Sequence, residues 1–132
     1  MTEIGHYARK PIAIIYEEKS AYKDTYAGAE DIVFLEAHHL IPSKPVTDSV
    51  VIFMHPAGAG GAYLPMPTAL ARIGIPVIFC NSRYRGVDSG LIMEKVVMDL
   101  GACVREAKEK LGYKKVILGG WSGGGSLSLF YQ

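Results

Sequence analysis

The most constraining feature of this sequence is an apolar run that leads directly into a Gly-x-Ser-x-Gly pattern. Val116-Ile117-Leu118 predicts a buried strand, and Ser122 follows it, flanked at two residues' distance by Gly120 and Gly124. A serine at a sharp strand-to-helix turn adopts a strained backbone conformation, and side chains two positions away would collide across the bend. The pattern therefore predicts a strand, a tight turn that exposes the serine hydroxyl, and a helix.

A second glycine-rich loop follows an earlier apolar run. Residues 49–54 are almost uniformly apolar, as strands covered on both faces are, and they end in His55-Pro56-Ala57-Gly58. With the serine pattern, this loop resembles the nucleophile elbow and the histidine–glycine oxyanion loop of the α/β-hydrolase superfamily. The resemblance extends from Val50 to the C-terminus. It departs from the usual pattern at Pro56, where glycine is common and where proline cannot donate an amide hydrogen.

The resemblance implies a serine hydrolase that cleaves a carboxylester or thioester through an acyl-enzyme on Ser122. A serine nucleophile argues against the dehalogenase and epoxide-hydrolase branches, which use aspartate. The amide of Gly123 would donate to the oxyanion, together with the amide of Ala57 or Gly58. The substrate would be a small acyl compound, and no cofactor or metal is needed.

In this superfamily the triad acid and histidine follow the serine along the chain, and here only ten residues follow Ser122. Residues 1–132 therefore resemble the N-terminal part of a single α/β-hydrolase domain, ending in the helix after the nucleophile. We expect a missing C-terminal segment or a second polypeptide to complete the sheet and the triad, and this chain alone to be inactive. The alternatives are a non-catalytic binding or scaffold module, or a half-domain that pairs its open sheet edge with a partner chain.

The order of apolar runs predicts a mostly parallel sheet with helices on both faces and an antiparallel start. Strands are expected at residues 11–16, 32–40, 49–54, 77–80 and 116–118, and helices at 67–72 and 91–111. Prolines at positions 42 and 45 are expected to end the second strand.

The helix predicted over residues 91–111 carries an apolar stripe at helical spacing. The stripe comprises Met93, Val96, Val97, Leu100, Val104, Ala107 and Leu111. Charged residues, among them Lys95 and Asp99, are assigned to the remaining surface. Glu106 and Lys110 have the spacing of a favourable ion pair, and Gly112 is expected to end the helix.

Four residues are candidates for substrate binding. Trp121 adjoins the nucleophile, where it would line an acyl pocket or, alternatively, pack in the core. Arg83, Tyr84 and Arg85 follow a predicted strand at the carboxyl edge, where open α/β sheets bind ligands. Either arginine could hold a substrate carboxylate, and the alternative is a surface loop tethered by local salt bridges.

Composition and the remaining motifs exclude several other functions. The net charge is +1 with no basic stripe, which argues against nucleic acid as a partner. Adjacent strand residues point to opposite faces, so His38 and His39 cannot share a metal ion. Cys80 and Cys103 lie in apolar settings and are expected to be reduced, buried thiols. With no membrane-length apolar stretch and no apolar leader, we expect a cytoplasmic protein that does not span a membrane.

Overall fold

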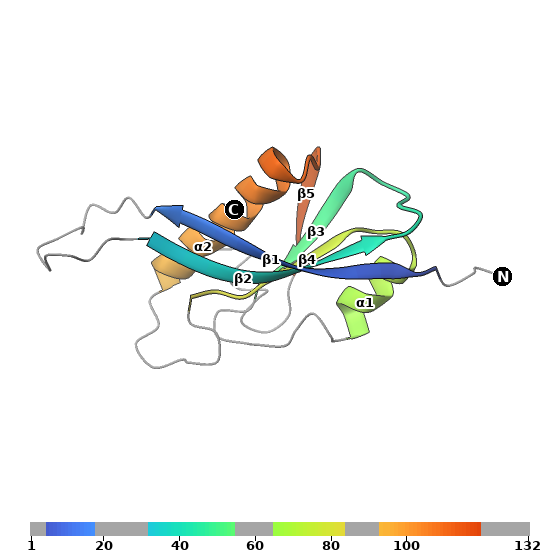
Figure 1. The fold of residues 1–132 in the computed structure, drawn as a ribbon, viewed down its shortest axis with the longest axis horizontal. Helices are drawn as coiled ribbons and strands as arrows, with labels where there is room; N and C mark the ends of the chain where they lie inside the picture. The colour runs from blue at the N-terminus through green and yellow to red at the C-terminus, as the bar shows by residue number, and fades with distance from the viewer. Residues whose placement is uncertain (1–4, 18–31, 55–64, 84–92, 120–132) are drawn as a thin grey trace, which may run out of the picture.

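The computed structural model describes residues 5–17, 32–54, 65–83 and 93–119, which form one five-stranded sheet and two helices (Figure 1). The strands are β1 (Tyr7–Glu17), β2 (Ile32–Pro42), β3 (Ser49–Phe53), β4 (Val77–Cys80) and β5 (Lys115–Gly119). The helices are α1 (Pro65–Arg72) and α2 (Met93–Arg105), and α2 continues into the π-helical turn η2 (Glu106–Lys110).

The sheet has the strand order β1-β2-β4-β3-β5. β2 pairs antiparallel with β1 and with β4, whereas β3 pairs parallel with β4 and β5. An antiparallel start followed by parallel strands is the arrangement predicted from the sequence. Because the chain moves from β3 to one neighbour through α1 and later reaches the other neighbour through α2, right-handed crossovers place the two helices on opposite faces.

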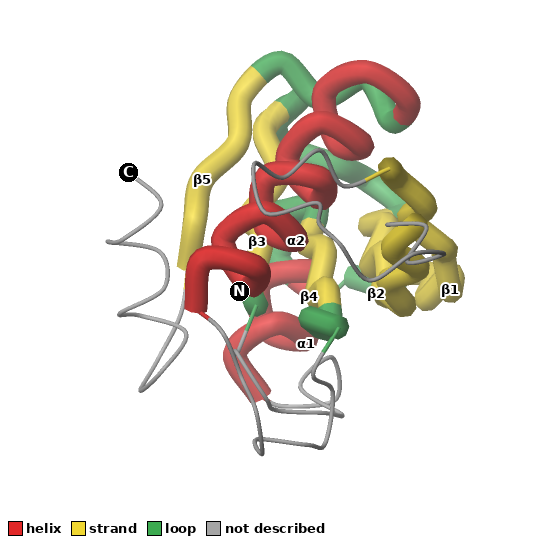
Figure 2. The backbone as a smooth tube through the Cα atoms, turned by 90° about the vertical axis from the view of Figure 1, so that its left-hand side faces the viewer, coloured by secondary structure: helices red, strands yellow, loops and turns green. Residues whose placement is uncertain are grey.

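Each face of the sheet therefore has its own apolar core, one that includes residues of α2 and one that includes a residue of α1. Figure 2 shows the course of the two helices beside the strands. On the α2 face, Val50, Ile52 and Ile78 are buried with residues of the helix that include Val96 and Leu100. The α1 face has a smaller core, formed by Leu40, Phe53, Ala71, Val77 and Phe79. Alternate residues of β3 and β4 enter different cores, so these strands are apolar throughout, as predicted.

The observed elements extend beyond several predicted ends. β1 begins at Tyr7 and runs through Pro11, which an edge strand tolerates because, among the described strands, β1 pairs only with β2. β2 continues to Pro42, whose Cα pairs with that of Tyr7, so the expectation that proline 42 lies outside the ladder is wrong and the strand is two residues longer than predicted. α1 begins at Pro65 rather than Pro67. The predicted ion pair of Lys110 with Glu106 is present at 3.5 Å.

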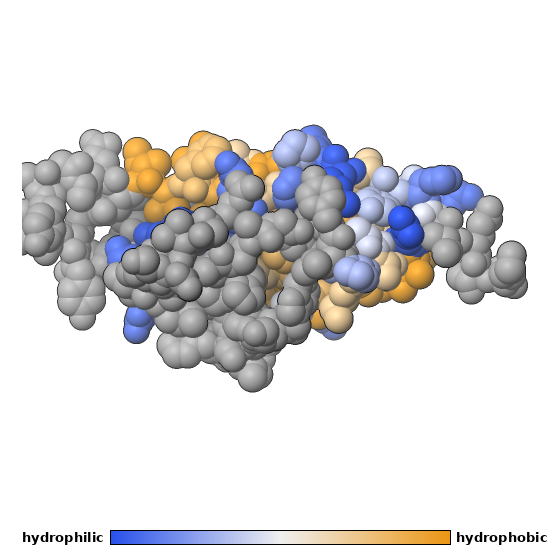
Figure 3. Space-filling view, turned by 90° about the horizontal axis from the view of Figure 1, so that it is seen from below, coloured by the Kyte–Doolittle hydropathy of each residue, from blue (hydrophilic) through white to orange (hydrophobic). Residues whose placement is uncertain are grey.

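The end of the hairpin formed by β1 and β2 presents apolar side chains to solvent. Ile15 and Phe34 are partners across the two strands, and both are exposed, as is Ile32. Figure 3 shows this apolar region at the left-hand end of the molecule. These side chains project from the α1 face of the hairpin, opposite Val33 and Leu35, which are buried against the α2 side.

Candidate active site

The candidate site lies at the carboxyl edge of the three parallel strands, where β3, β4 and β5 end side by side. Phe53 at the end of β3 is the Cα partner of Gly119 at the end of β5. Neighbouring strands are about 4.8 Å apart, so the segments that follow these two residues leave the sheet from adjacent positions. The first of these segments carries the loop at residues 55–58, and the second carries the Gly-x-Ser-x-Gly pattern.

Most of the residues predicted for the site lie outside the described part of the chain. These are Ala57, Gly58, Tyr84, Arg85, Gly120, Trp121, Ser122, Gly123 and Gly124. Arg83 is described, and so are the strand ends from which all three segments depart.

Close packing against Phe53 restricts which residue type can occupy position 119, the last position of β5. A Cβ atom placed on Gly119 would lie 2.7 Å from Cε1 of the Phe53 ring, closer than Cβ atoms approach non-bonded carbon atoms in proteins. Any larger residue at position 119, one residue before the predicted elbow begins, would therefore have to displace the Phe53 ring.

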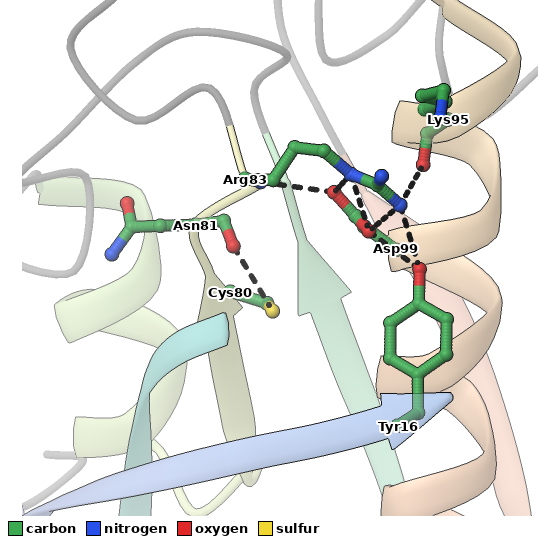
Figure 4. A network of polar contacts seen from close by, with 6 residues as sticks. All are labelled: Tyr16, Cys80, Asn81, Arg83, Lys95 and Asp99. Carbon is green, nitrogen blue, oxygen red and sulfur yellow. Dashed lines mark hydrogen bonds and ion pairs between the residues drawn. The ribbon is translucent and has the colours of Figure 1, made fainter. Parts of the chain in front are cut away.

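Arg83 is held by a partly buried polar network that joins three elements (Figure 4). Its backbone N–H donates to Asp99 Oδ2 at 2.9 Å, and its Nη2 donates to Asp99 Oδ1 at 2.9 Å. The Tyr16 hydroxyl donates to the same Oδ1 at 2.6 Å and accepts a bond from Arg83 Nη2 at 3.0 Å. The network thus ties the end of β4 to α2 and to the edge strand β1.

Asp99 is the centre of this network, and the prediction that it belongs to the solvent-facing side of the helix is wrong. Its side chain is 0 % exposed. Burial of a carboxylate is costly unless cations and donors surround it, and Arg83 and Tyr16 supply both. Burial and the hydrogen bond to Asp99 raise the pKa of the Tyr16 hydroxyl, so this group stays protonated and donates.

In this structure the Arg83 guanidinium forms a salt bridge with Asp99. Its Nε lies 3.2 Å from each oxygen of Asp99, and its side chain is only 18 % exposed. The partner is not local, since Asp99 lies 16 residues further along the chain. Arg83 therefore anchors the start of the segment that contains Tyr84 and Arg85.

Asn81 is a further polar residue at this edge that the sequence pattern did not single out. It follows β4 directly, it is buried, and its backbone N–H donates to the carbonyl of Glu36 at 2.9 Å. Its side-chain Oδ1 is buried and has no hydrogen-bond partner among the described residues. A buried acceptor of this kind is suited to receive a hydrogen bond from a water molecule or ligand.

Cys80 and Cys103 are buried free thiols on the α2 face, as predicted. A hydrogen bond with Cys103, together with burial, raises the pKa of the Cys80 thiol well above its usual value. A protonated thiol is a poor nucleophile, so Cys80 is a structural residue.

The buried His39 and the half-buried Tyr113 form a second polar pair, away from the carboxyl edge. His39 Nε2 is hydrogen-bonded to the Tyr113 hydroxyl at 2.6 Å, and the two rings meet edge to face. Burial lowers the pKa of His39, and the nearby charge of Lys10 lowers it further. Within the described ranges, no three His, Cys, Asp or Glu side chains cluster in a way that could hold a metal ion. No helix in those ranges is long and apolar enough to cross a membrane.

Comparison of the sequence with known protein families and with curated proteins finds no match. The structure is similar to that of an α/β serine hydrolase without a lid from Xanthomonas campestris, with a TM-score of 0.59 and 24% identity over 74% of this chain. It is also similar to brefeldin A esterase, a bacterial homologue of human hormone-sensitive lipase, with a TM-score of 0.57 and 21% identity over 92% of the chain. Esterase Est22 matches with a TM-score of 0.52 and 16% identity, also over 92%.

These similarities show the fold. The strand order, the antiparallel start and the two crossover helices are those of an α/β-hydrolase-type fold, as predicted. The chain spans half or less of each of these three proteins: 50%, 34% and 37% of their lengths, in the order given.

Proposed function

We propose that this chain supplies the nucleophile part of a serine hydrolase that cleaves a carboxylester or thioester in a small acyl substrate. The observation that carries the proposal is the pairing of Phe53 with Gly119 at the carboxyl edge. It supports placing the two loops needed for acyl transfer next to each other, since one loop begins two residues after Phe53 and the other begins directly after Gly119.

In the proposed reaction, Ser122 attacks the acyl carbonyl carbon and forms a tetrahedral intermediate. A histidine takes the serine proton and then delivers it to the leaving group, which departs as an alcohol or thiol. The amides of Gly123 and of Ala57 or Gly58 stabilise the oxyanion, and each such donor contributes on the order of 3 kcal/mol. Water then hydrolyses the acyl-enzyme and restores the serine.

The histidine and its orienting acid come, in this proposal, from a C-terminal segment or from a second polypeptide. An additional strand could pair with the open edge of β5, since β5 is the last strand in the sheet order and its Ile117 is 47 % exposed. The same edge favours the second candidate function, a non-catalytic half-domain that pairs with a partner chain. Trp121, Tyr84 and Arg85 remain candidates for contacts with the substrate, and we place the protein in the cytoplasm.

Intact mass before and after treatment with a fluorophosphonate probe tests the proposal. When the triad is assembled, we expect an adduct that maps to Ser122. The adduct should be absent in Ser122→Ala and retained in the matched control Ser126→Ala. Any additional species in the spectrum would identify the chain that carries the histidine and acid. A lack of adduct with only the 14.3 kDa chain present would mean that this chain alone is inactive. If fusion to candidate partner segments also failed to restore labelling, the non-catalytic candidate would be favoured.

A further inference from the structure

A hollow of about 350 Å³ lies at the edge of the sheet opposite the candidate active site. It is bordered by residues 5–6 before β1, by residues 42–46 at the end of β2 and in the connection to β3, and by residues 71–74 at the end of α1. These three segments meet near the amino ends of β3 and β4. A parallel strand rises about 3.3 Å per residue, so the five residues of β3 separate the two edges by roughly 16 Å. The hollow is therefore distinct from the proposed acyl-transfer site.

Main-chain hydrogen bonds hold the walls of this hollow in place. Gly5 N donates to the carbonyl of Arg72, Ser43 N donates to that of His6, and Val46 N donates to that of Gly74, each at 2.9 Å. These three bonds link all three bordering segments, so the hollow is formed before any ligand arrives.

Gly74 allows the walls to approach this closely. Its φ of 98° is in the left-handed region, and a Cβ atom at this position would lie 2.9 Å from Val46 Cγ1 and 3.0 Å from the Lys44 carbonyl oxygen. Glycine is therefore needed for both the turn and the contact.

The polar side of the hollow is basic. Lys44 and Arg72, both exposed, line it together with His6, and none of the described residues around it is acidic. Among the described residues, no carboxylate forms an ion pair with Lys44 or Arg72. A guanidinium-bearing and an ammonium-bearing residue that line one hollow, with no carboxylate paired to either among the described residues, favour an anionic group, either a carboxylate or a phosphate.

The other side of the hollow is apolar and exposed. Val46 is 71 % exposed and Ile73 is 53 % exposed, and both line the hollow beside the basic residues. Toward the right-hand end of Figure 3, hydrophobic and hydrophilic residues lie next to one another. A ligand that covered Val46 and Ile73 would remove apolar surface from water as its anionic end met the cations.

We propose that this hollow binds an amphiphilic anion, a short apolar chain that ends in a carboxylate or a phosphate monoester. A volume of about 350 Å³ lies within the range of small-molecule sites and accommodates one such molecule. Lys44 and Arg72 contact its head group, and Val46 and Ile73 contact its chain.

Isothermal titration of the full chain with octanoate and with octyl phosphate tests the site. Acetate, which has only the anionic group, and octanol, which has the apolar chain without a charge, are the comparison compounds. We expect one octanoate per chain and at least roughly tenfold weaker binding of acetate and octanol. The double variant Lys44→Gln/Arg72→Gln should weaken octanoate binding by roughly tenfold or more, since each charge-assisted contact contributes to affinity. Lys108→Gln/Lys115→Gln changes the net charge equally at exposed positions outside the hollow and should leave binding unchanged. Ser122→Ala should also have no effect.

Equal affinity of the double variant and the wild type for octanoate and for octyl phosphate would overturn the proposal, as would the absence of binding of both compounds. Binding to anionic phosphatidylglycerol vesicles without binding of soluble octanoate or octyl phosphate would identify a membrane-contacting surface instead and would also overturn it. If the double variant does not fold, amide chemical shifts of the wild type decide the question. Octanoate should shift the amides of Gly5 and Gly74, and shifts confined to other residues would contradict the site.

Discussion

The Tyr16 hydroxyl donates a 2.6 Å hydrogen bond to Asp99, although 83 residues separate the two in the sequence. Arg83 contacts both residues, so an edge strand, a strand end and a helix share one buried carboxylate. The Asp99 carboxylate thereby fixes the residue from which one of the carboxyl-edge segments departs.

We expect Asp99→Asn to destabilise the fold by about 2–4 kcal/mol. The change keeps the shape of the side chain but leaves the partly buried guanidinium of Arg83 without its counter-charge, which costs several kcal/mol when such pairs are fully buried. Urea denaturation followed by circular dichroism measures the loss. Glu109→Gln, at an exposed position of η2, is the matched control and should change the free energy of unfolding by less than about 0.5 kcal/mol. Equal stability of the two variants would contradict the role assigned to Asp99.

The raised pKa of Tyr16 predicts a loss of stability in alkaline solution. The unfolded chain releases this proton near pH 10, whereas the folded chain retains it to higher pH. The contribution of Tyr16 to the free energy of unfolding is therefore at its full value below about pH 10 and falls as the pH rises above that value. Tyr16→Phe should make the fall between pH 10 and 11 less steep. Tyr7→Phe, on the same strand, should retain the wild-type slope, and identical slopes in all three proteins would refute the prediction.

The strands and helices were largely predictable from sequence because apolar runs and helical spacing report burial directly. Every predicted strand and helix in the described ranges is present, and errors are confined to the ends of elements, as with Pro42 in the β2 ladder. The α/β-hydrolase-type fold followed from two glycine-rich loops placed after apolar strands, and the structural similarities confirm the fold.

The Tyr16–Arg83–Asp99 network could be predicted only in part. Asp99 lies three residues after Val96 and four before Cys103, both of which are buried, so its position on the apolar side of the helix was a usable signal. No comparable signal marks Tyr16, because the tertiary fold alone brings β1 beside α2. The nucleophile and oxyanion residues remain predictions, since they lie outside the described ranges.

The lowered pKa of His39 predicts a loss of stability in mild acid. The folded chain resists protonation of this buried imidazole, whereas the unfolded chain takes up the proton near pH 6.5. The contribution of His39 to the free energy of unfolding is therefore at its full value above about pH 6.5 and declines as the pH falls toward the lower folded-state pKa. His39→Gln should flatten the dependence of the free energy of unfolding between pH 7 and 5. His6→Gln, at an exposed position, is the control, and a flattened profile in His6→Gln alone would reverse the assignment.

The contact between Phe53 and Gly119 predicts a defect that a second substitution repairs. Gly119→Ala places a methyl group 2.7 Å from the Phe53 ring, and displacement of a packed ring costs about 1–3 kcal/mol. Because Gly119 directly precedes the proposed elbow, the same change should slow fluorophosphonate labelling of Ser122 wherever labelling is observed. Phe53→Leu shortens the neighbouring side chain, so Gly119→Ala should cost less in the Phe53→Leu background than in the wild type. A double-mutant cycle of unfolding free energies measures this coupling. Additive effects would show that the two residues do not constrain each other at the carboxyl edge.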